Sequence, residues 1–145
     1  MALVGITPVN PLYTTKSPTG IIIGSAVLRA ALATTTSYVV TSYVSTAQAH
    51  RINVQFTMVW AASTSTEWIV EWSPDGTTFY QSVNYSVTGG VNTALLASNT
   101  FAAGASATWL DSYEIQDAFM RLSVKKTGGA GADTLAVACT LLGAP

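Results

Sequence analysis

The stretch Thr66–Val83, TEWIVEWSPDGTTFYQSV, decides the fold class of this chain. Its first half alternates between an apolar set of side chains and a mostly acidic set: Trp68, Val70 and Trp72, then Glu67, Ile69 and Glu71. Side chains along a strand point to opposite faces with a period of two residues. The two indoles therefore share one face and the two carboxylates share the other. A helix would scatter these residues around its circumference, so the pattern predicts a strand.

This strand leads into a tight turn at Ser73–Thr77, SPDGT. Proline presets φ for the first corner of a type I turn, aspartate tolerates the second corner, and glycine takes the left-handed position that closes the turn. A short glycine-containing connection between two strand-like runs predicts a β-hairpin. The return strand is Thr78–Val83, which carries the good strand formers Phe79, Tyr80 and Val83.

The aromatic and acidic residues of the hairpin each admit two interpretations. Tryptophan on the alternating face of a strand is typical of a core, because indole buries a large apolar area. Beside an Asp-Gly turn it could instead form a platform on which sugars stack. Glu67 and Glu71 could be the catalytic pair of a glycosidase, but that chemistry needs two carboxyls flanking a bond in a cleft. Carboxylates on the wet face of a hairpin are commoner, so we expect a core face and a solvated face.

The composition indicates one domain with little surface charge. A chain of 145 residues is long enough for a single domain with a real core. Hydrophobic residues make up 49% and charged residues only 9%, whereas a typical soluble domain has about 25% charged residues. A surface with so little charge is poorly protected against association. We therefore expect much of this surface to be covered in an assembly.

Charge and hydropathy argue against nucleic acid and membrane as partners. The net charge is −1, so the chain has no basic footprint for nucleic acid. Its one basic cluster places Arg121 and Lys125 on the same strand face, next to Lys126, which is typical of a solvated face. No apolar run reaches the ~18 residues of a membrane helix. The first residues, MALVG, lack the basic and apolar regions of a signal peptide, so we expect the chain to be made and assembled in a cytoplasm.

No pattern in the sequence predicts a catalytic, cofactor or metal site. The single cysteine, Cys139, excludes an intrachain disulfide, and its alternation with apolar residues indicates a small buried hydrophobe. One cysteine and one histidine, His50, are too few for a Cys/His zinc site. The glycine-rich segment Thr127–Asp133 lacks the spacing and the lysine of a phosphate loop. We therefore expect a protein that is not an enzyme and holds no cofactor.

Residues 1–20 differ in kind from the rest of the chain. Their prolines, Pro8, Pro11 and Pro18, exclude a helix and a central strand. The segment is nevertheless too apolar for a solvated tail, because it contains Leu3, Val4, Ile6, Val9, Leu12 and Tyr13. We expect an extended N-terminal arm that lies on a partner or wraps its own domain, followed by a single domain at 21–145.

The rest of the chain reads as strands separated by turns. Asn84–Thr88 continues the return strand of the hairpin. The other expected strands are Ile21–Leu28, Ser37–Thr46, His50–Trp60, Val91–Phe101, Ala107–Ile115, Phe119–Lys126 and Thr134–Leu142. Arg29–Ala33 is ambiguous between strand and a short helical turn. About eight strands with turn signals between them, and no helical periodicity of useful length, predict an all-β fold, an antiparallel β-sandwich or jelly roll.

The last expected strand carries small uncharged residues on one face. Ala136, Ala138 and Thr140 lie opposite Cys139 and would allow another surface to approach closely. A flat, uncharged, exposed strand is otherwise an aggregation hazard. We therefore expect a covered edge or a subunit interface here, and these three residues join the apolar arm residues as candidate assembly contacts.

Three segments resemble β-sandwich structural proteins of tailed-bacteriophage virions. They are Glu71–Gln81, EWSPDGTTFYQ, then Phe119–Gly129, FMRLSVKKTGG, and Asp133–Leu142, DTLAVACTLL. In that group an S-x-DG-T-x-aromatic hairpin is paired with a late aromatic-x-R-L-x-V strand. The resemblance implies a capsid cement or decoration protein on the head surface of the virion, a homotrimer whose terminal arms grip the shell of major capsid protein. Neck and tail proteins share such sandwiches, so these locations stay open.

Two other classes of function compete with this reading. The same hairpin occurs in discoidin-like and other carbohydrate-binding sandwiches, where surface aromatics such as Tyr80, Tyr85 or Tyr113 would stack on sugar rings. Exposed aromatics in a concave site would favour that class, whereas buried aromatics would favour a structural role. An enzyme is the third class, but the one histidine and seven acidic residues form no recognisable triad, dyad or metal site.

Overall fold

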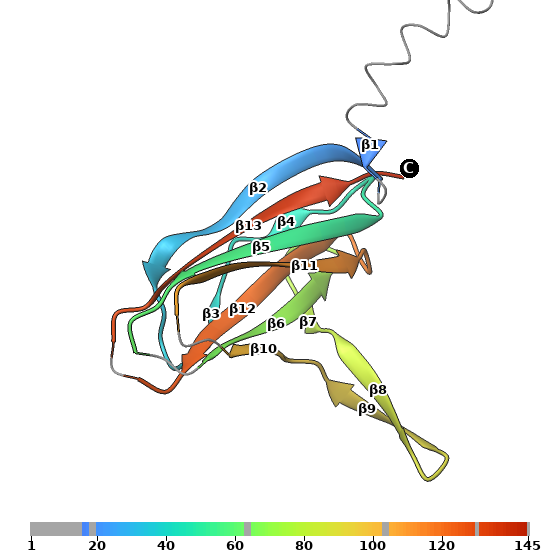
Figure 1. Cartoon of the computed structure of the whole chain (residues 1–145). Helices are drawn as coiled ribbons and strands as arrows, with labels where there is room; N and C mark the ends of the chain where they lie inside the picture. Colours follow the sequence, from blue (N-terminus) through green and yellow to red (C-terminus); the bar gives the residue numbers. More distant parts are fainter. Residues whose placement is uncertain (1–15, 18–19, 63–64, 103–104, 130, 145) are drawn as a thin grey trace, which may run out of the picture.

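The computed structural model describes residues 16–17, 20–62, 65–102, 105–129 and 131–144. These residues form strands, turns and loops (Figure 1). The strands are β1 (Lys16–Ser17), β2 (Gly20–Ala33), β3 (Val39–Val40), β4 (Val44–Ser45), β5 (Arg51–Val59), β6 (Ser65–Ser73), β7 (Tyr80–Gln81), β8 (Val83–Thr88), β9 (Val91–Leu96), β10 (Asn99–Ala102), β11 (Ala107–Glu114), β12 (Phe119–Thr127) and β13 (Thr134–Leu142). Within the described ranges, no helix has the length and apolarity needed to cross a membrane.

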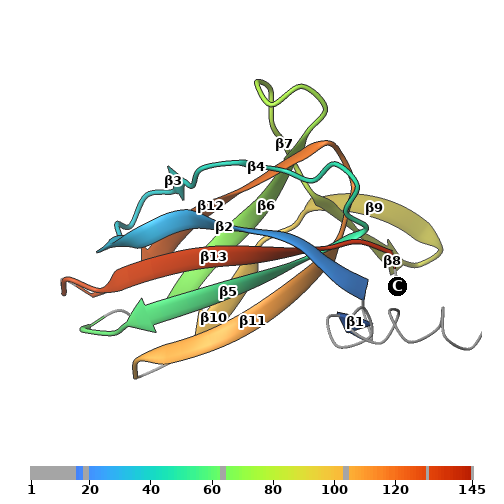
Figure 2. The same cartoon turned by 90° about the horizontal axis from the view of Figure 1, so that it is seen from above.

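The strands form two packed sheets and a separate two-stranded ribbon (Figures 1 and 2). The five-stranded sheet has the order β1-β2-β13-β5-β11. The six-stranded sheet has the order β10-β6-β12-β3, with β4 added to β12 and β7 added to β6. The strand pairs of the described residues are antiparallel. The predicted all-β antiparallel sandwich is therefore confirmed.

The core lies between the two sheets because each central strand turns one alternating face inward. In β5, every second side chain is buried, as the sequence alternation predicts. The five-stranded sheet contributes Leu28, Ile52, Val54, Phe56, Met58, Leu135, Val137, Cys139 and Leu142 to the core, and the six-stranded sheet contributes Trp68, Val70, Trp72, Met120, Leu122 and Val124. The core interpretation of the two hairpin tryptophans is confirmed. Cys139 is the expected small buried hydrophobe, and burial raises the pKa of its thiol.

Four aromatic rings form a continuous cluster that joins the two sheets. Phe56 on β5 packs against Trp68 on β6, with ring centroids 4.7 Å apart, and against Trp109 on β11 at 5.1 Å. Trp109 in turn stacks on Phe101 of β10 at 4.2 Å. Aromatic pairs at such distances stabilise a core beyond the area that they bury. Phe56 is fully buried within this aromatic cluster.

Charged side chains on the outer face of the six-stranded sheet form ion pairs. The register places Glu71 beside Arg121 and Glu67 beside Lys125 across β6 and β12. Arg121 Nε lies 2.9 Å from a carboxylate oxygen of Glu71, and Lys125 Nζ lies 3.3 Å from one of Glu67. Tyr38 also donates a hydrogen bond to Glu67. The two carboxylates of the hairpin therefore neutralise basic residues of the neighbouring strand on the face predicted for them.

A buried ion pair ties the end of β12 to two loops, those before β6 and before β13, at one end of the sandwich. Asp133 is fully buried, and its carboxylate accepts hydrogen bonds from the backbone N–H groups of Ala61 and Ala62. Its other oxygen faces Lys126 Nζ at 3.4 Å, and that ammonium group also donates to the Gly131 carbonyl. A Cβ at Gly131 would lie 2.8 Å from the Ala62 side chain. The glycine-rich segment between β12 and β13 is therefore shaped for close loop packing.

The predicted turn after β6 forms around the Asp75 carboxylate. Its Oδ1 accepts hydrogen bonds from the backbone N–H groups of Thr77 at 2.8 Å and Thr78 at 2.9 Å, and from the Ser73 hydroxyl at 2.9 Å. Gly76 adopts the expected left-handed backbone, with φ 73°. The N–H groups of Thr78 and Thr77, followed by the Ser73 hydroxyl, lower the pKa of Asp75 because they favour its charged form.

This lowered pKa predicts how the turn responds to acid. Because the pKa of Asp75 is lower in the folded state, the carboxylate stabilises the fold above its unfolded-state pKa, and that contribution is lost as the pH falls through the folded-state pKa. We expect Asp75→Asn to destabilise the protein at about pH 7 and to matter less at about pH 3. Urea unfolding of both proteins at the two pH values measures this. A stability difference between the two proteins that is the same at both pH values would contradict this prediction.

The structure resolves one ambiguous segment and corrects one predicted strand. Arg29–Ala33, left open between strand and helical turn, completes β2, and the Arg29 guanidinium donates to the carbonyl oxygens of Leu135 and Ala33. Ser37–Thr46 is not one strand but the two short strands β3 and β4. Between them, the Thr41 N–H donates to Leu122 in β12 and the Ser42 N–H donates to Leu28 in β2. The chain bonds to both sheets here, which interrupts a single ladder.

The predicted strands after the turn are also divided. Thr78–Val83 is reduced to β7, because the chain leaves the six-stranded sheet after Gln81 and begins the ribbon at Val83. Val91–Phe101 likewise splits into β9 of the ribbon and β10, which returns to β6. These divisions and the additional strand β1, which pairs with β2, raise the strand number from the expected value of about eight to the thirteen that the described residues form.

Candidate functional site

The residues predicted as assembly contacts fall into two groups. Leu3, Val4, Ile6, Val9, Leu12 and Tyr13 lie outside the described residues. Ala136, Ala138 and Thr140 lie on the outward face of β13, each half-buried. β13 pairs with β2 on one side and β5 on the other, so it is an inner strand of its sheet. Its small side chains therefore belong to an open sheet face and not to a sheet edge.

Exposed apolar side chains of β2 continue this face. The register places Ala138 beside Val27, whose side chain is 69% exposed, and Thr140 beside Ser25. On the other side, Ala138 is paired with Gln55 of β5. This outer face is thus a surface of small, neutral and apolar groups. Arg51 and Glu114 form a loose ion pair, 3.8 Å long, at its end.

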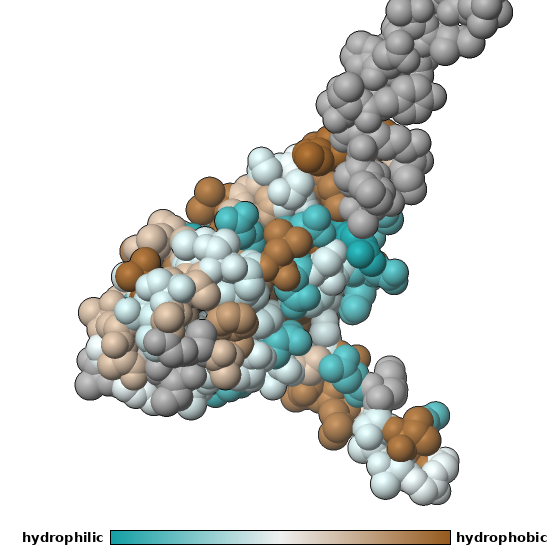
Figure 3. Space-filling model, in the orientation of Figure 1, coloured by the Kyte–Doolittle hydropathy of each residue, from teal (hydrophilic) through white to brown (hydrophobic). Residues whose placement is uncertain are grey.

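The ribbon of β8 and β9 is the second exposed apolar element. It projects from the sandwich and ends in a turn at Gly89 and Gly90, both with positive φ (Figure 1). The register places Val83 opposite Leu96 and Val87 opposite Asn92, so Val83, Val87 and Leu96 share a face. Val87 is 67% exposed and Leu96 69%. Figure 3 shows hydrophobic residues along this projection.

The ribbon carries no charge. Between Asp75 and Asp111 the sequence contains no aspartate, glutamate, lysine, arginine or histidine. In the described part of the chain, β8 and β9 pair only with each other, so the outer edge of each strand has no strand partner. Two-stranded hairpins are marginally stable in water by themselves. An uncharged, apolar ribbon with open edges is the kind of element that a partner surface can cover.

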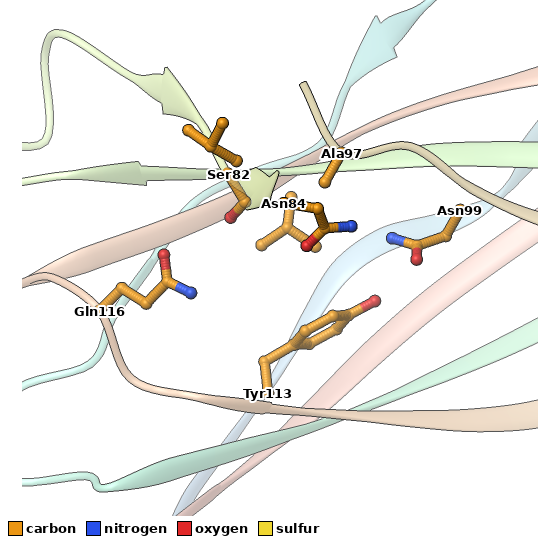
Figure 4. A pocket seen from close by; sticks show the side chains of 8 residues that line it. Ser82, Asn84, Ala97, Asn99, Tyr113 and Gln116 are labelled. Carbon is orange, nitrogen blue, oxygen red and sulfur yellow. The ribbon is translucent and has the colours of Figure 1, made fainter. Parts of the chain in front are cut away.

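A cavity of about 120 Å³ lies where the ribbon joins the sandwich (Figure 4). Its lining residues come from the two ribbon ends, from β6 and β10, and from β11 with the loop that follows: Val70, Ser82, Val83, Asn84, Ala97, Asn99, Tyr113 and Gln116. Backbone hydrogen bonds hold this junction, since the Ser82 N–H donates to Val70 and the Ala97 N–H donates to Ser82. The cavity is therefore built from both the ribbon and the body.

Two of the polar groups in this cavity are fixed by hydrogen bonds. The Tyr113 hydroxyl accepts a hydrogen bond from Trp68 Nε1 at 2.8 Å and donates one to Asp111. Burial, with the Asp111 hydrogen bond, raises the pKa of Tyr113, so the phenol stays protonated. The Ser82 hydroxyl accepts a hydrogen bond from Trp72 Nε1 at 2.9 Å. Core tryptophans thus hold these two cavity groups in place.

Of the three tyrosines proposed for sugar stacking, the structure describes the side chains of Tyr80 and Tyr113, and these lie in different surroundings. Tyr80 on β7 is 62% exposed, whereas Tyr113 is half-buried against the core. The backbone of Tyr85 lies in the ribbon, and its side chain is outside what the structure describes. Tyr43 packs edge-on against Phe119 with centroids 5.7 Å apart. The described side chains of Tyr80 and Tyr113 therefore form no aromatic platform with each other.

The titratable groups are used mainly for structural contacts. In the described ranges, no three of the histidine, cysteine, aspartate and glutamate residues gather as a metal site would require. Cys139 lies in the core, and His50 donates its backbone N–H to Leu142 at the start of β5. Glu67 and Glu71 are engaged with Lys125 and Arg121. What this arrangement offers chemically is neutral hydrogen bonding and apolar contact.

Sequence reasoning missed both the separation of the ribbon and the cavity at its base. The long uncharged interval and the Gly89-Gly90 turn were available as signals for a projecting hairpin. The cavity amides gave no local signal, because Asn84, Asn99 and Gln116 are distant in sequence and meet only through the fold.

Comparison with known proteins shows likeness of shape without a family. No protein-family model and no curated protein matches the sequence. Solved structures of similar shape include the PBSX exported protein XepA, with a TM-score of 0.49 and 14% identity over 85% of this chain. The chain spans 38% of that protein.

Two further structures match this chain over most of their own length. The SPBc2 prophage-derived protein YomS matches with a TM-score of 0.43 and 11% identity, over 81% of this chain and 91% of that one. The CBM22-1 xylan-binding domain of Paenibacillus barcinonensis Xyn10C matches with a TM-score of 0.45 and 12% identity, over 89% of this chain and 99% of that one. At these values the likeness assigns neither a family nor an activity.

Proposed function

We propose that this chain is a non-catalytic structural protein of a tailed-phage virion, a capsid cement or decoration protein that adheres to the head surface. The observation that carries the proposal is the neutral exposed surface. The side chains of Val87 and Leu96 are exposed on the ribbon. The sequence between Asp75 and Asp111, which contains the ribbon, has no charged residue. The resemblance of the β6 hairpin and of β12 to phage sandwich proteins supplies the virion context.

The pairing of charged side chains within the chain supports an adhesive role. Four ion pairs join charged residues within the described chain, and the pair between Lys126 and Asp133 is buried. A partner that covers the ribbon or the outer face of β13 would therefore remove few unpaired charges from water. Burial of apolar surface is favourable by roughly 25 cal/mol per Å², whereas burial of an unpaired charge is costly. This surface is suited to being covered.

The mechanism is multivalent attachment by a rigid block. Copies of the chain form a homo-oligomer, which we expect to be a trimer, through neutral faces such as the one around Ala136, Ala138 and Thr140. The apolar residues of the segment 1–20 add contacts to the major capsid protein. Each contact is modest, but several linked contacts raise the overall affinity far above that of one. The protein resides on the virion surface after assembly in the host cytoplasm.

The test is re-addition of purified protein to phage heads that lack it because the gene has been deleted. We expect saturable co-sedimentation with the heads at a fixed stoichiometry. Removal of residues 1–20 is expected to abolish binding, while circular dichroism of the shortened chain keeps its β-sheet spectrum. No co-sedimentation of the full-length protein would contradict the head assignment. Full occupancy by the shortened chain would contradict the role of the arm.

A carbohydrate-binding module is the second candidate, and one observation favours it. The cavity at the base of the ribbon is lined by neutral hydrogen-bonding side chains, including Asn84, Asn99 and Gln116. Virion adhesion to a glycan would use such a site. The two roles are separable, because head binding and saccharide binding are measured independently.

A further inference from the structure

We propose that the cavity at the base of the ribbon binds one ring of a neutral saccharide, held by the side-chain amides of Asn84, Asn99 and Gln116. The proposal deepens and rests on the second candidate function, saccharide binding, and is independent of the structural role of the protein, which head co-sedimentation tests separately. It rests on the chemistry, availability and position of the groups that line this cavity.

The chemistry of the lining selects a neutral, polyhydroxylated ligand. None of the lining residues is charged, so nothing in the wall would compensate the desolvation of an ion. Each amide side chain offers both donors and an acceptor. A sugar hydroxyl is likewise both donor and acceptor, so adjacent hydroxyls can bond to adjacent amides. Three amides around one space therefore match several hydroxyls of one ring.

The three amides are available for a ligand. Among the described residues, the side chains of Asn84, Asn99 and Gln116 form no hydrogen bond with other protein groups, and none of their polar atoms is both buried and unsatisfied. They therefore meet solvent, which a ligand can replace. Figure 4 shows these amides converging from different segments on a common space.

The rest of the wall is organised for a ring. The Tyr113 side chain is held by its hydrogen bonds with Trp68 and Asp111, and Ser82 is held by Trp72. Rigid groups lose little freedom when a ligand binds, which favours affinity. The apolar lining residues, among them Val70 and Val83, can contact the C–H groups of a sugar. The wall thus offers both polar and apolar contacts.

The size of the cavity limits the ligand to one small unit. About 120 Å³ is below the roughly 300–1,000 Å³ of pockets for drug-sized ligands. It still exceeds the space that a single water requires. A peptide strand would instead need hydrogen-bonding groups spaced along a line, as in strand addition to a sheet edge. Convergent amides around a compact space favour a ring.

The test is a titration of the full-length protein with methyl α-glucoside, methyl β-galactoside and methyl α-mannoside, followed by nitrogen-15 NMR of the side-chain amides. We expect at least one glycoside to give saturable shifts at Asn84, Asn99 and Gln116, with a Kd on the order of 1 mM. Asn84→Ala and Asn99→Ala are each expected to weaken that binding about tenfold. Sodium acetate, a small anion, is expected to give no saturable shift at these amides.

Asn92→Ala is the matched control, because Asn92 is an exposed amide on β9 that does not line the cavity. It is expected to leave saccharide affinity unchanged. Asn99→Asp keeps the side-chain shape and is expected to weaken binding, which separates loss of the amide from loss of the fold. Tryptophan fluorescence reports whether each variant is folded.

Three results would overturn the proposal. One is the absence of saturable shifts with all three glycosides. Another is equal affinity in the wild type and in the Asn84→Ala/Asn99→Ala double variant. The third is saturable binding of N-acetylglycinamide without binding of any glycoside, which would identify the cavity as a site for peptide amides.

Discussion

Asp133→Ala is expected to lower the free energy of unfolding by about 3–5 kcal/mol, the cost of breaking a buried ion pair by removing one partner. Asp133 is fully buried, and Lys126 is 7% exposed. The substitution leaves the Lys126 ammonium group buried without its carboxylate. It also removes the acceptor for the N–H groups of Ala61 and Ala62. Urea unfolding followed by tryptophan fluorescence measures the change.

Glu114→Ala is the matched control for this prediction. Glu114 also faces a basic residue, Arg51 at 3.8 Å, but its side chain is 84% exposed. Exposed pairs contribute only about 0–1 kcal/mol. The two substitutions thus remove the same kind of group from opposite environments. If Asp133→Ala cost no more than Glu114→Ala, the buried pair would not be a structural element.

Phe56→Ala is expected to cost about 3–5 kcal/mol, the range for truncating a large buried aromatic residue. The Phe56 ring lies between Trp68 at 4.7 Å and Trp109 at 5.1 Å. Its loss opens a cavity at the point where the two sheets meet. Because two tryptophans flank the site, the near-ultraviolet circular dichroism is expected to change as well. Chemical unfolding gives the free energy.

The control for Phe56→Ala lies on the strand next to it. Leu110→Ala also truncates a large apolar side chain, but this side chain is exposed on the outer face of β11. Substitutions at exposed positions usually change stability by no more than about 0.5 kcal/mol. A small effect of Phe56→Ala, similar to that of Leu110→Ala, would show that the aromatic cluster does not join the sheets as described.

The alternating patterns of the sequence predicted which faces are buried. In β5 and β6, a period of two residues is enough to separate core from surface, since each strand packs one face on the opposite sheet. The turn before Tyr80 was also predictable, but from the types of residue at the turn and not from alternation. Pro74, Asp75 and Gly76 specify a turn by local backbone preference.

Where the chain leaves a sheet was not predictable from local pattern. The segment Ser37–Thr46 is rich in strand-forming residues, yet its backbone hydrogen bonds go to both sheets. The residues of β8 and β9 have ordinary strand preferences. Their pattern does not predict that these two strands project from the sandwich and do not join either sheet. Strand propensity describes a fit to a pleated surface. Strand propensity does not specify which sheet a strand joins, or whether the surface that covers it belongs to the same chain.

The candidate site was the least predictable part. The cavity combines Asn84 from the ribbon, Asn99 from β10 and Gln116 from the loop after β11. Only the three-dimensional path of the chain brings them together. The neutral character of the surface was visible in the composition, with 9% charged residues, but its location on the ribbon and on the outer face of β13 required the fold.

The solution mass of the full-length protein, measured by light scattering over a range of protein and salt concentrations, tests the central claim most directly. Adhesion through neutral faces predicts a closed oligomer, with a trimer of the 15.1 kDa chain as the expected state. It also predicts that the mass is the same at low and high ionic strength, because salt screens charged contacts and not apolar ones. A monomer of 15.1 kDa at every concentration would contradict self-association through this surface.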